Sequence, residues 1–133
     1  MDSTPSHEDF EALIKELAQV TVAHVNKELR RKKWGLKSAK WKSAFAEENG
    51  GENNTDPRVG KFRVVLPNGK VFAKLDLPIE AADVMVRIWR IKDQVFAKKK
   101  WYGFKVTVKP DGEYQCEFTY DPRCLGNLDF FNS

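Results

Sequence analysis

Hydrophobic residues recur at two different spacings along this chain, and each spacing predicts one type of element. Between Ser6 and Lys33 they return every three or four positions, which is typical of a helix with one buried face. Ser6 stands three residues before Asp9, a weaker form of the capping box that predicts where this helix begins. A second stripe of the same spacing follows Pro78 and runs toward Ala97, which predicts a second helix.

Apolar residues that alternate with polar ones predict strands in the rest of the chain. Such alternations lie between Trp34 and Phe45, over 62–66 and 71–75, and over 104–108 and 114–120. Asn68-Gly69 and Pro110-Asp111-Gly112 are turn sequences, so the later alternations predict two antiparallel hairpins. The predicted fold is α+β in the order α-β-β-β-α-β-β, with two helices packed on one face of an antiparallel sheet.

The length of 133 residues fits a single domain over 1–133. Within it we expect a flexible N-terminus at 1–6, a mobile polar loop at 48–57 and a tail at 123–133. No apolar run approaches the roughly 18 residues of a membrane span, and residues 1–9 do not resemble a secretory signal. We therefore expect a cytoplasmic protein with no membrane partner.

The net charge is only +4, but the charges are unevenly placed. A basic cluster comprises Arg30, Arg31, Lys32, Lys33, Lys37, Lys40 and Lys42, whereas the C-terminal part is acidic. The cluster overlaps Trp34 and Trp41, so it is compatible with a small nucleic-acid-binding protein that stacks bases on these rings. The modest charge favours the other interpretation, in which the lysines are solvated and both tryptophans enter the core.

The residues with reactive side chains form no set that a catalytic mechanism requires. His24 falls within the apolar stripe of the first helix, and Cys116 shares a strand face with Tyr114 and Phe118, so we expect both to pack rather than react. The two cysteines and two histidines show no metal-ligand spacing. We expect neither an enzyme, nor a metal, nor a cofactor; an enzyme would need His24 beside Cys116 or a carboxylate.

The segment from Ile88 to Asp121 carries a recognisable order of residues: Trp89, Trp101, Asp111-Gly112, Tyr114, Phe118 and Tyr120-Asp121. In this order it resembles the C-terminal half of the YezG-like immunity proteins of bacterial polymorphic and contact-dependent toxin systems. The resemblance implies a small cytoplasmic antitoxin that binds and neutralises a cognate toxin, commonly a secreted nuclease. One departure is the basic overall charge, since many immunity proteins against nucleases are acidic. It favours binding away from the toxin's cleft, use of the acidic C-terminal part, or a toxin that is not a nuclease.

A protein of this kind needs a specific surface of about 800 Å² and a few aromatic or charged anchors. The loop at 49–56, the basic stretch at 32–42 and the tail at 123–133 are candidates for that surface, and we favour the tail or the acidic edge. The candidate toxin-binding residues there are Glu113, Glu117, Asp121, Arg123, Asp129, Phe130 and Phe131. The chain is expected to act as a monomer or a homodimer.

Overall fold

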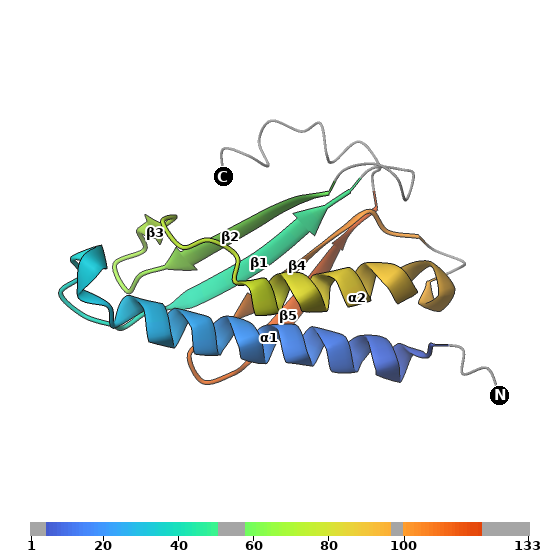
Figure 1. The fold of residues 1–133 in the computed structure, drawn as a ribbon, viewed down its shortest axis with the longest axis horizontal. Helices are drawn as coiled ribbons and strands as arrows, with labels where there is room; N and C mark the ends of the chain where they lie inside the picture. Colours follow the sequence, from blue (N-terminus) through green and yellow to red (C-terminus); the bar gives the residue numbers. More distant parts are fainter. Residues whose placement is uncertain (1–4, 51–57, 97–99, 121–133) are drawn as a thin grey trace.

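The fold was analysed in a computed structural model, which describes residues 5–50, 58–96 and 100–120. Its elements are α1 (His7–Leu29), the 3-10 turn η1 (Lys32–Trp34), β1 (Ser43–Asn49), β2 (Val59–Val65), β3 (Val71–Phe72), α2 (Ile79–Val95), β4 (Gly103–Val108) and β5 (Tyr114–Thr119). The strands form one antiparallel sheet in the order β3-β2-β1-β4-β5. Figure 1 shows both helices lying side by side on one face of this sheet, so the predicted α+β fold is confirmed.

Local sequence explains how both helices begin. The Ser6 hydroxyl accepts a hydrogen bond from the Asp9 amide at 3.2 Å, and the Asp9 carboxylate accepts one from the Ser6 amide at 2.9 Å. Pro78 precedes α2 with φ −69°, a value that already suits the first helical turn.

A salt bridge links the two helices: the Arg87 guanidinium of α2 donates to the Glu16 carboxylate of α1 at 2.9 Å. No helix in the described residues has an apolar stretch long enough to cross a membrane.

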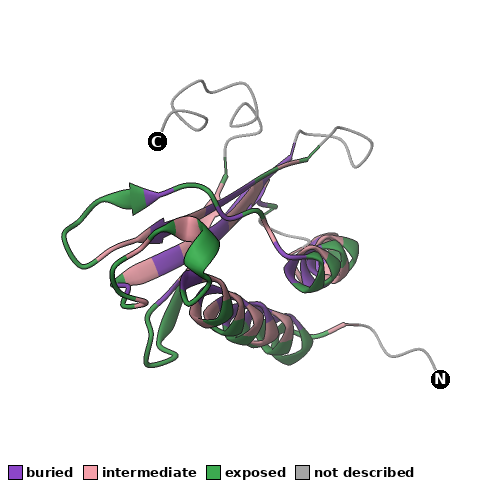
Figure 2. Ribbon diagram, turned by 60° about the vertical axis from the view of Figure 1, so that its left-hand side comes forward, coloured by how far each residue is buried: buried purple, intermediate pink, exposed green. Residues whose placement is uncertain are grey.

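The core lies between the helix pair and the sheet. In Figure 2 the buried residues gather where helices and sheet face each other, and the outer helix surfaces are exposed. Leu17 and Val25 of α1, Ile88 of α2 and Val106 of β4 are fully buried. Trp101 is also fully enclosed, in ring contact with Phe10 and Phe104. These side chains fix the relative positions of the strands on which the exposed sheet edge depends.

The first strand begins later than the alternation between Trp34 and Phe45 predicts. Gly35 takes a left-handed φ of 67°, and β1 starts only at Ser43. Trp41 is instead tied to α1, since its indole donates to Asn26 at 2.9 Å, and Trp34 packs edge-on against Phe72. The aromatic residues therefore anchor a connection between α1 and β1, because pairing with β2 begins only at Ser43 and pairing with β4 only at Ala44.

Two further boundaries differ from the sequence prediction. Glu48 and Asn49, expected in the loop at 48–57, end β1, where each is paired on both sides by β2 and β4; residues 51–57 lie outside the described part. The second strand of the first hairpin is only two residues long, and Val71 points outward with 55% exposure.

The inward face of β1 is formed by small residues. Ala44 and Ala46 face the helices, and Phe45 lies on the opposite face. Small side chains let α1 approach the sheet closely, which alternation by itself does not reveal.

Candidate functional site

One long edge of the sheet is formed by β5, and we term its six residues, with Glu113 before them, the β5 edge. The sheet order leaves β5 with a neighbour on one side only, among the residues that the structure describes. Its residues are exposed or half-buried throughout, whereas β4 beside it is mostly buried. At the opposite edge β3 is only two residues long and pairs only with Val64 and Val65, so residues 59–63 of β2 have no described strand neighbour on that side. The β5 edge is thus the longer of the two sheet edges open to another chain.

The register shows which backbone groups of β5 face outward. The Lys109 amide donates to the Glu113 carbonyl at 2.9 Å, which makes this a hydrogen-bonded pair. Such pairs alternate along an antiparallel ladder, so Gln115 and Glu117 turn their backbone groups toward β4. Tyr114, Cys116 and Phe118 therefore direct their N–H and C=O groups away from the sheet.

The side of β5 that faces α1 borders a hollow of about 320 Å³. It is lined by His7, Phe10, Glu11, Ile14, Tyr114, Cys116 and Phe118. Tyr114, 40% exposed, also lines a hollow of about 400 Å³ farther along α1 and one of about 320 Å³ beside Thr107. An exposed tyrosine at the junction of three hollows offers the large, amphipathic contact that dominates many protein interfaces.

On the far face of the sheet, away from the helices, four charged side chains form one row across four strands. The register places Lys61 of β2 opposite Glu47 of β1, Glu47 opposite Lys105 of β4, and Lys105 opposite Glu117 of β5. The charges alternate, and the row ends at the sheet edge on the exposed carboxylate of Glu117. Within the described part of the chain, Glu117 forms no salt bridge.

Burial shifts the pKa values of two residues of this row, Glu47 and Lys61. It raises the pKa of the Glu47 carboxyl, against the opposing charges of Lys105 and Lys61, and it lowers the pKa of the Lys61 ammonium. The Lys105 ammonium lies 4.2 Å from the centre of the Phe45 ring. Glu117 is the most solvent-accessible charge of the row and the one that a partner could reach.

Cys116 and His24 are not arranged for catalysis with one another. Burial, and secondarily the charge of Glu117, raises the pKa of the Cys116 thiol to about 12, so a thiolate is disfavoured at neutral pH. His24 packs edge-on against Phe62 of β2, and β1 and β4 separate that strand from β5. The prediction that Cys116 packs is met only in part, because it is half-buried at the sheet edge.

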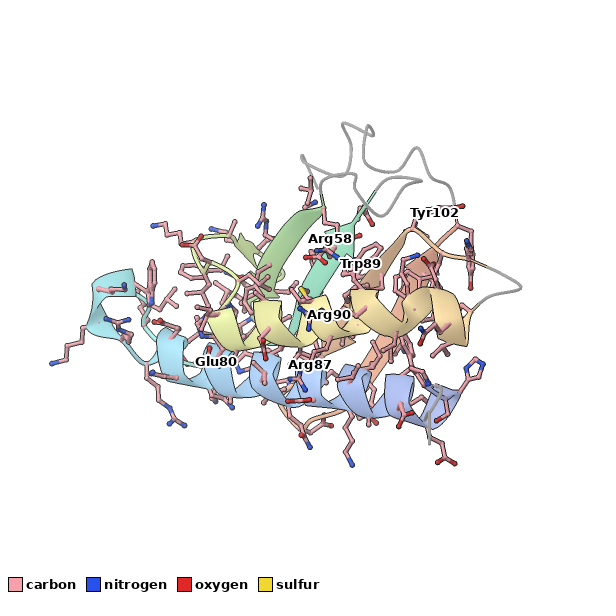
Figure 3. All side chains as sticks on the ribbon, turned by 45° about the vertical axis from the view of Figure 1, so that its right-hand side comes forward. Arg58, Glu80, Arg87, Trp89, Arg90 and Tyr102 are labelled. Carbon is pink, nitrogen blue, oxygen red and sulfur yellow. The ribbon has the colours of Figure 1, made fainter. Side chains whose placement is uncertain are left out.

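A cluster that the sequence pattern did not reveal surrounds Lys92 of α2. This lysine is 5% exposed, and its ammonium donates to the Trp101 carbonyl at 2.8 Å and to Asp93 at 3.0 Å. It lies 5.0 Å from the Trp101 ring and 5.1 Å from that of Trp89. Figure 3 shows Arg58 beside Trp89, 5.4 Å from the ring centre. The chain's own cations occupy these aromatic faces, which gives the cluster a structural role.

Of the predicted toxin-binding residues, the structure brings Glu113 and Glu117 together on the β5 edge. Asp121, Arg123, Asp129, Phe130 and Phe131 lie outside the described residues. Glu113 forms an exposed salt bridge with Lys109 at 3.4 Å, which contributes little to stability. Tyr114 was not among the predicted binding residues, because alternation predicts which face it occupies but not that its strand ends the sheet.

The basic cluster is a second charged surface, and all seven of its members are exposed. Its aromatic residues are less accessible: Trp41 is 6% exposed, and the indole of Trp34 donates to Glu28 at 3.3 Å. The predicted burial of Trp41 is confirmed, and Trp34 is half-buried.

Within the described ranges, no three His, Cys, Asp or Glu side chains are grouped so that they could hold a metal ion. No protein-family model matches this chain, and no curated protein sequence matches it either.

Proposed function

We propose that this protein is an immunity protein that binds and neutralises a cognate bacterial toxin through protein–protein contact. The observation that carries the proposal is the β5 edge, where backbone groups with no strand neighbour among the described residues, an exposed tyrosine and acidic side chains lie together. The resemblance of residues 88–121 to YezG-like immunity proteins supports the same function. Binding of this kind needs a complementary surface and no reaction.

A nuclease is the toxin class that suits this edge best. Nucleases bind a phosphate backbone, so they carry lysine and arginine around their substrate cleft. Glu113 and Glu117 offer opposite charge on an otherwise basic protein, and complementary charge speeds association. Because Glu113 and Glu117 both lie on the β5 edge, we infer that the contact with the toxin is local and oriented by Tyr114.

The test is co-expression of the chain with the product of a neighbouring toxin gene, followed by growth measurement and purification of the complex. We expect full protection by the wild type and weaker binding by Tyr114→Ala, by about 30-fold for a loss of about 2 kcal/mol. Ile79→Ala is the matched control, since Ile79 is 80% exposed at the start of α2. Protection that is unchanged by Tyr114→Ala would place the interface elsewhere, and a failure to protect against any neighbouring toxin would refute the function.

The exposed basic cluster favours one alternative, a small nucleic-acid-binding protein. With Trp41 buried, such binding would rest on phosphate contacts and would weaken steeply as salt rises. Fluorescence anisotropy with labelled DNA and RNA at two salt concentrations distinguishes the classes. Binding at low salt that is lost in Lys32→Glu/Lys33→Glu would favour the alternative, and absence of binding at low salt would remove it.

A further inference from the structure

We propose that the β5 edge accepts a sixth strand, an extended segment of the partner in which basic residues alternate with apolar ones. The identification of that partner as a toxin rests on the proposed function, whereas the strand-binding site follows from the edge itself. The segment would lie beside Tyr114–Thr119 and continue the sheet, as in other cases where a peptide is bound by strand addition.

Apart from the carboxylate of Glu117, β5 lacks the features by which sheet edges usually avoid pairing with other chains. Edges are protected by lysine, proline, a bulge or a very short strand. On the other side of the sheet β3 is only two residues long, and the part of β2 beyond it carries Lys61 and Arg63. β5 has six residues, none of them lysine or proline, and pairs with β4 in continuous register. Its outer edge is therefore suited to pairing.

The outward backbone groups determine how the added strand would bind. Tyr114, Cys116 and Phe118 present their N–H and C=O groups at the outer edge, spaced two residues apart. A partner strand that pairs with all three residues supplies hydrogen-bond partners for these backbone groups. Tyr114, Cys116 and Phe118 also place their side chains on the α1 side. The partner residues that pair with their backbone groups therefore face the same side with their own side chains.

On the α1 side, the added strand needs apolar side chains. The hollow of about 320 Å³ beneath the edge has Phe10 and Ile14 of α1 at its floor and Cys116 and Phe118 at its rim. Phe10 and Ile14 are 3% exposed, whereas Phe118 is only half-buried. An aliphatic residue of the added strand opposite Cys116 would extend the core by one strand and cover the exposed part of the Phe118 ring.

On the far face, the same strand needs a basic residue. The row Lys61, Glu47, Lys105 and Glu117 alternates in sign, and the next position lies opposite Glu117. The Cβ atoms of residues directly opposite in adjacent strands are about 5 Å apart, so a lysine or arginine at this position could pair with the Glu117 carboxylate. A carboxylate there would face Glu117 and be repelled. The alternation thus specifies both the pattern and the sign of the partner's side chains.

A second copy of this chain is a poorer occupant. Pairing β5 with its own copy would bring Glu113 and Glu117 of both chains to the shared far face, and β5 supplies no cation between them. Like charges on adjacent strands oppose pairing. A foreign basic strand meets the same edge with opposite charge.

The test uses the whole protein with two capped peptides, one alternating lysine with valine and one alternating glutamate with valine. Amide hydrogen exchange, read by NMR, should show that the lysine peptide protects the Tyr114, Cys116 and Phe118 amides and that the glutamate peptide does not. Glu117→Lys should reverse the preference, by about two- to fivefold for each peptide, as expected for an exposed charge pair. Glu80→Lys, at the exposed start of α2 and outside the hollow, is the charge-matched control.

A backbone variant separates strand addition from side-chain binding. Cys116→Pro removes an outward N–H without removing a bond to β4, and proline is tolerated on such edge positions. It should lower affinity for the lysine peptide at least about tenfold, whereas Cys116→Ala, which keeps the N–H, should bind nearly as the wild type does. If Cys116→Pro does not fold, the exchange data and Glu117→Lys still decide the matter.

Each outcome has a distinct meaning. Peptide binding that leaves the three amides unprotected, equal binding of both peptides, or protection that rises with protein concentration alone would overturn the proposal, the last in favour of a second copy. A toxin complex in which these amides exchange freely would also overturn it while leaving the proposed function intact. Protection by the lysine peptide without neutralisation of any toxin would support the strand site and refute the immunity function.

Discussion

Any side chain at Gly103 is predicted to destabilise the fold for steric reasons. It faces Asn49 in the pairing of β1 with β4, and Asn49 is 3% exposed. A Cβ atom at Gly103 would overlap the Asn49 amide oxygen and lie 2.9 Å from its amide carbon and 3.2 Å from the Glu48 carbonyl oxygen. Because backbone on one side and a buried side chain on the other leave little room, Gly103→Ala should lower the free energy of unfolding by about 1–3 kcal/mol.

The free energy of unfolding is measured by urea unfolding followed by circular dichroism. In thermal unfolding of the same variant, the melting temperature should fall by roughly 4 °C for each kcal/mol lost. Gly60→Ala is the control, since a Cβ there meets its nearest atoms at an ordinary 3.8 Å. If the Asn49 side chain causes the effect, Asn49→Gly/Gly103→Ala should be more stable than the sum of the two single changes by at least about 1 kcal/mol. Equal stability of Gly103→Ala and wild type, or strict additivity of the pair, would refute the reasoning.

Three further predictions concern burial, charge and capping. Burial is the main cause of the raised pKa of Glu48, opposed by Arg58 and by the Trp89 indole N–H, which approaches the carboxylate without a well-aligned hydrogen bond. A raised folded-state pKa gives stability that is present below about 4.5, the ordinary value, and is lost as pH rises through the folded value. Glu48→Gln should therefore be more stable than wild type at neutral pH, with the difference vanishing at low pH in urea titrations; a difference that does not depend on pH would contradict this reasoning. Lys92→Met removes the donor to the buried Trp101 carbonyl and should cost about 1–3 kcal/mol, against almost none for the exposed Lys74→Met; equal unfolding midpoints would contradict the role assigned to Lys92. Ser6→Ala should cost about 1 kcal/mol and increase amide exchange in the first turn of α1, and unchanged exchange there would show that the cap is dispensable.

The candidate site could be predicted from the sequence only in part. The charge distribution along the chain indicated Glu113 and Glu117 as candidate residues. Tyr114 was missed because its exposure depends on β5 being the edge strand, a consequence of strand order. The row that ends at Glu117 was missed for the same reason, since Lys61 and Glu47 come from strands that are distant in sequence.

The sequence by itself determined the elements that local signals specify. The cap at Ser6, Pro78 before α2 and the turns at Gly69 and Gly112, with φ values of 86° and 96°, act over a few residues, so the chain encodes them directly. The order in which strands lie in the sheet, the inward turn of Ala44 and the late start of β1 were decided only by the tertiary structure. Each depends on contacts between residues far apart in the chain, and no local pattern records which distant surface a residue will meet.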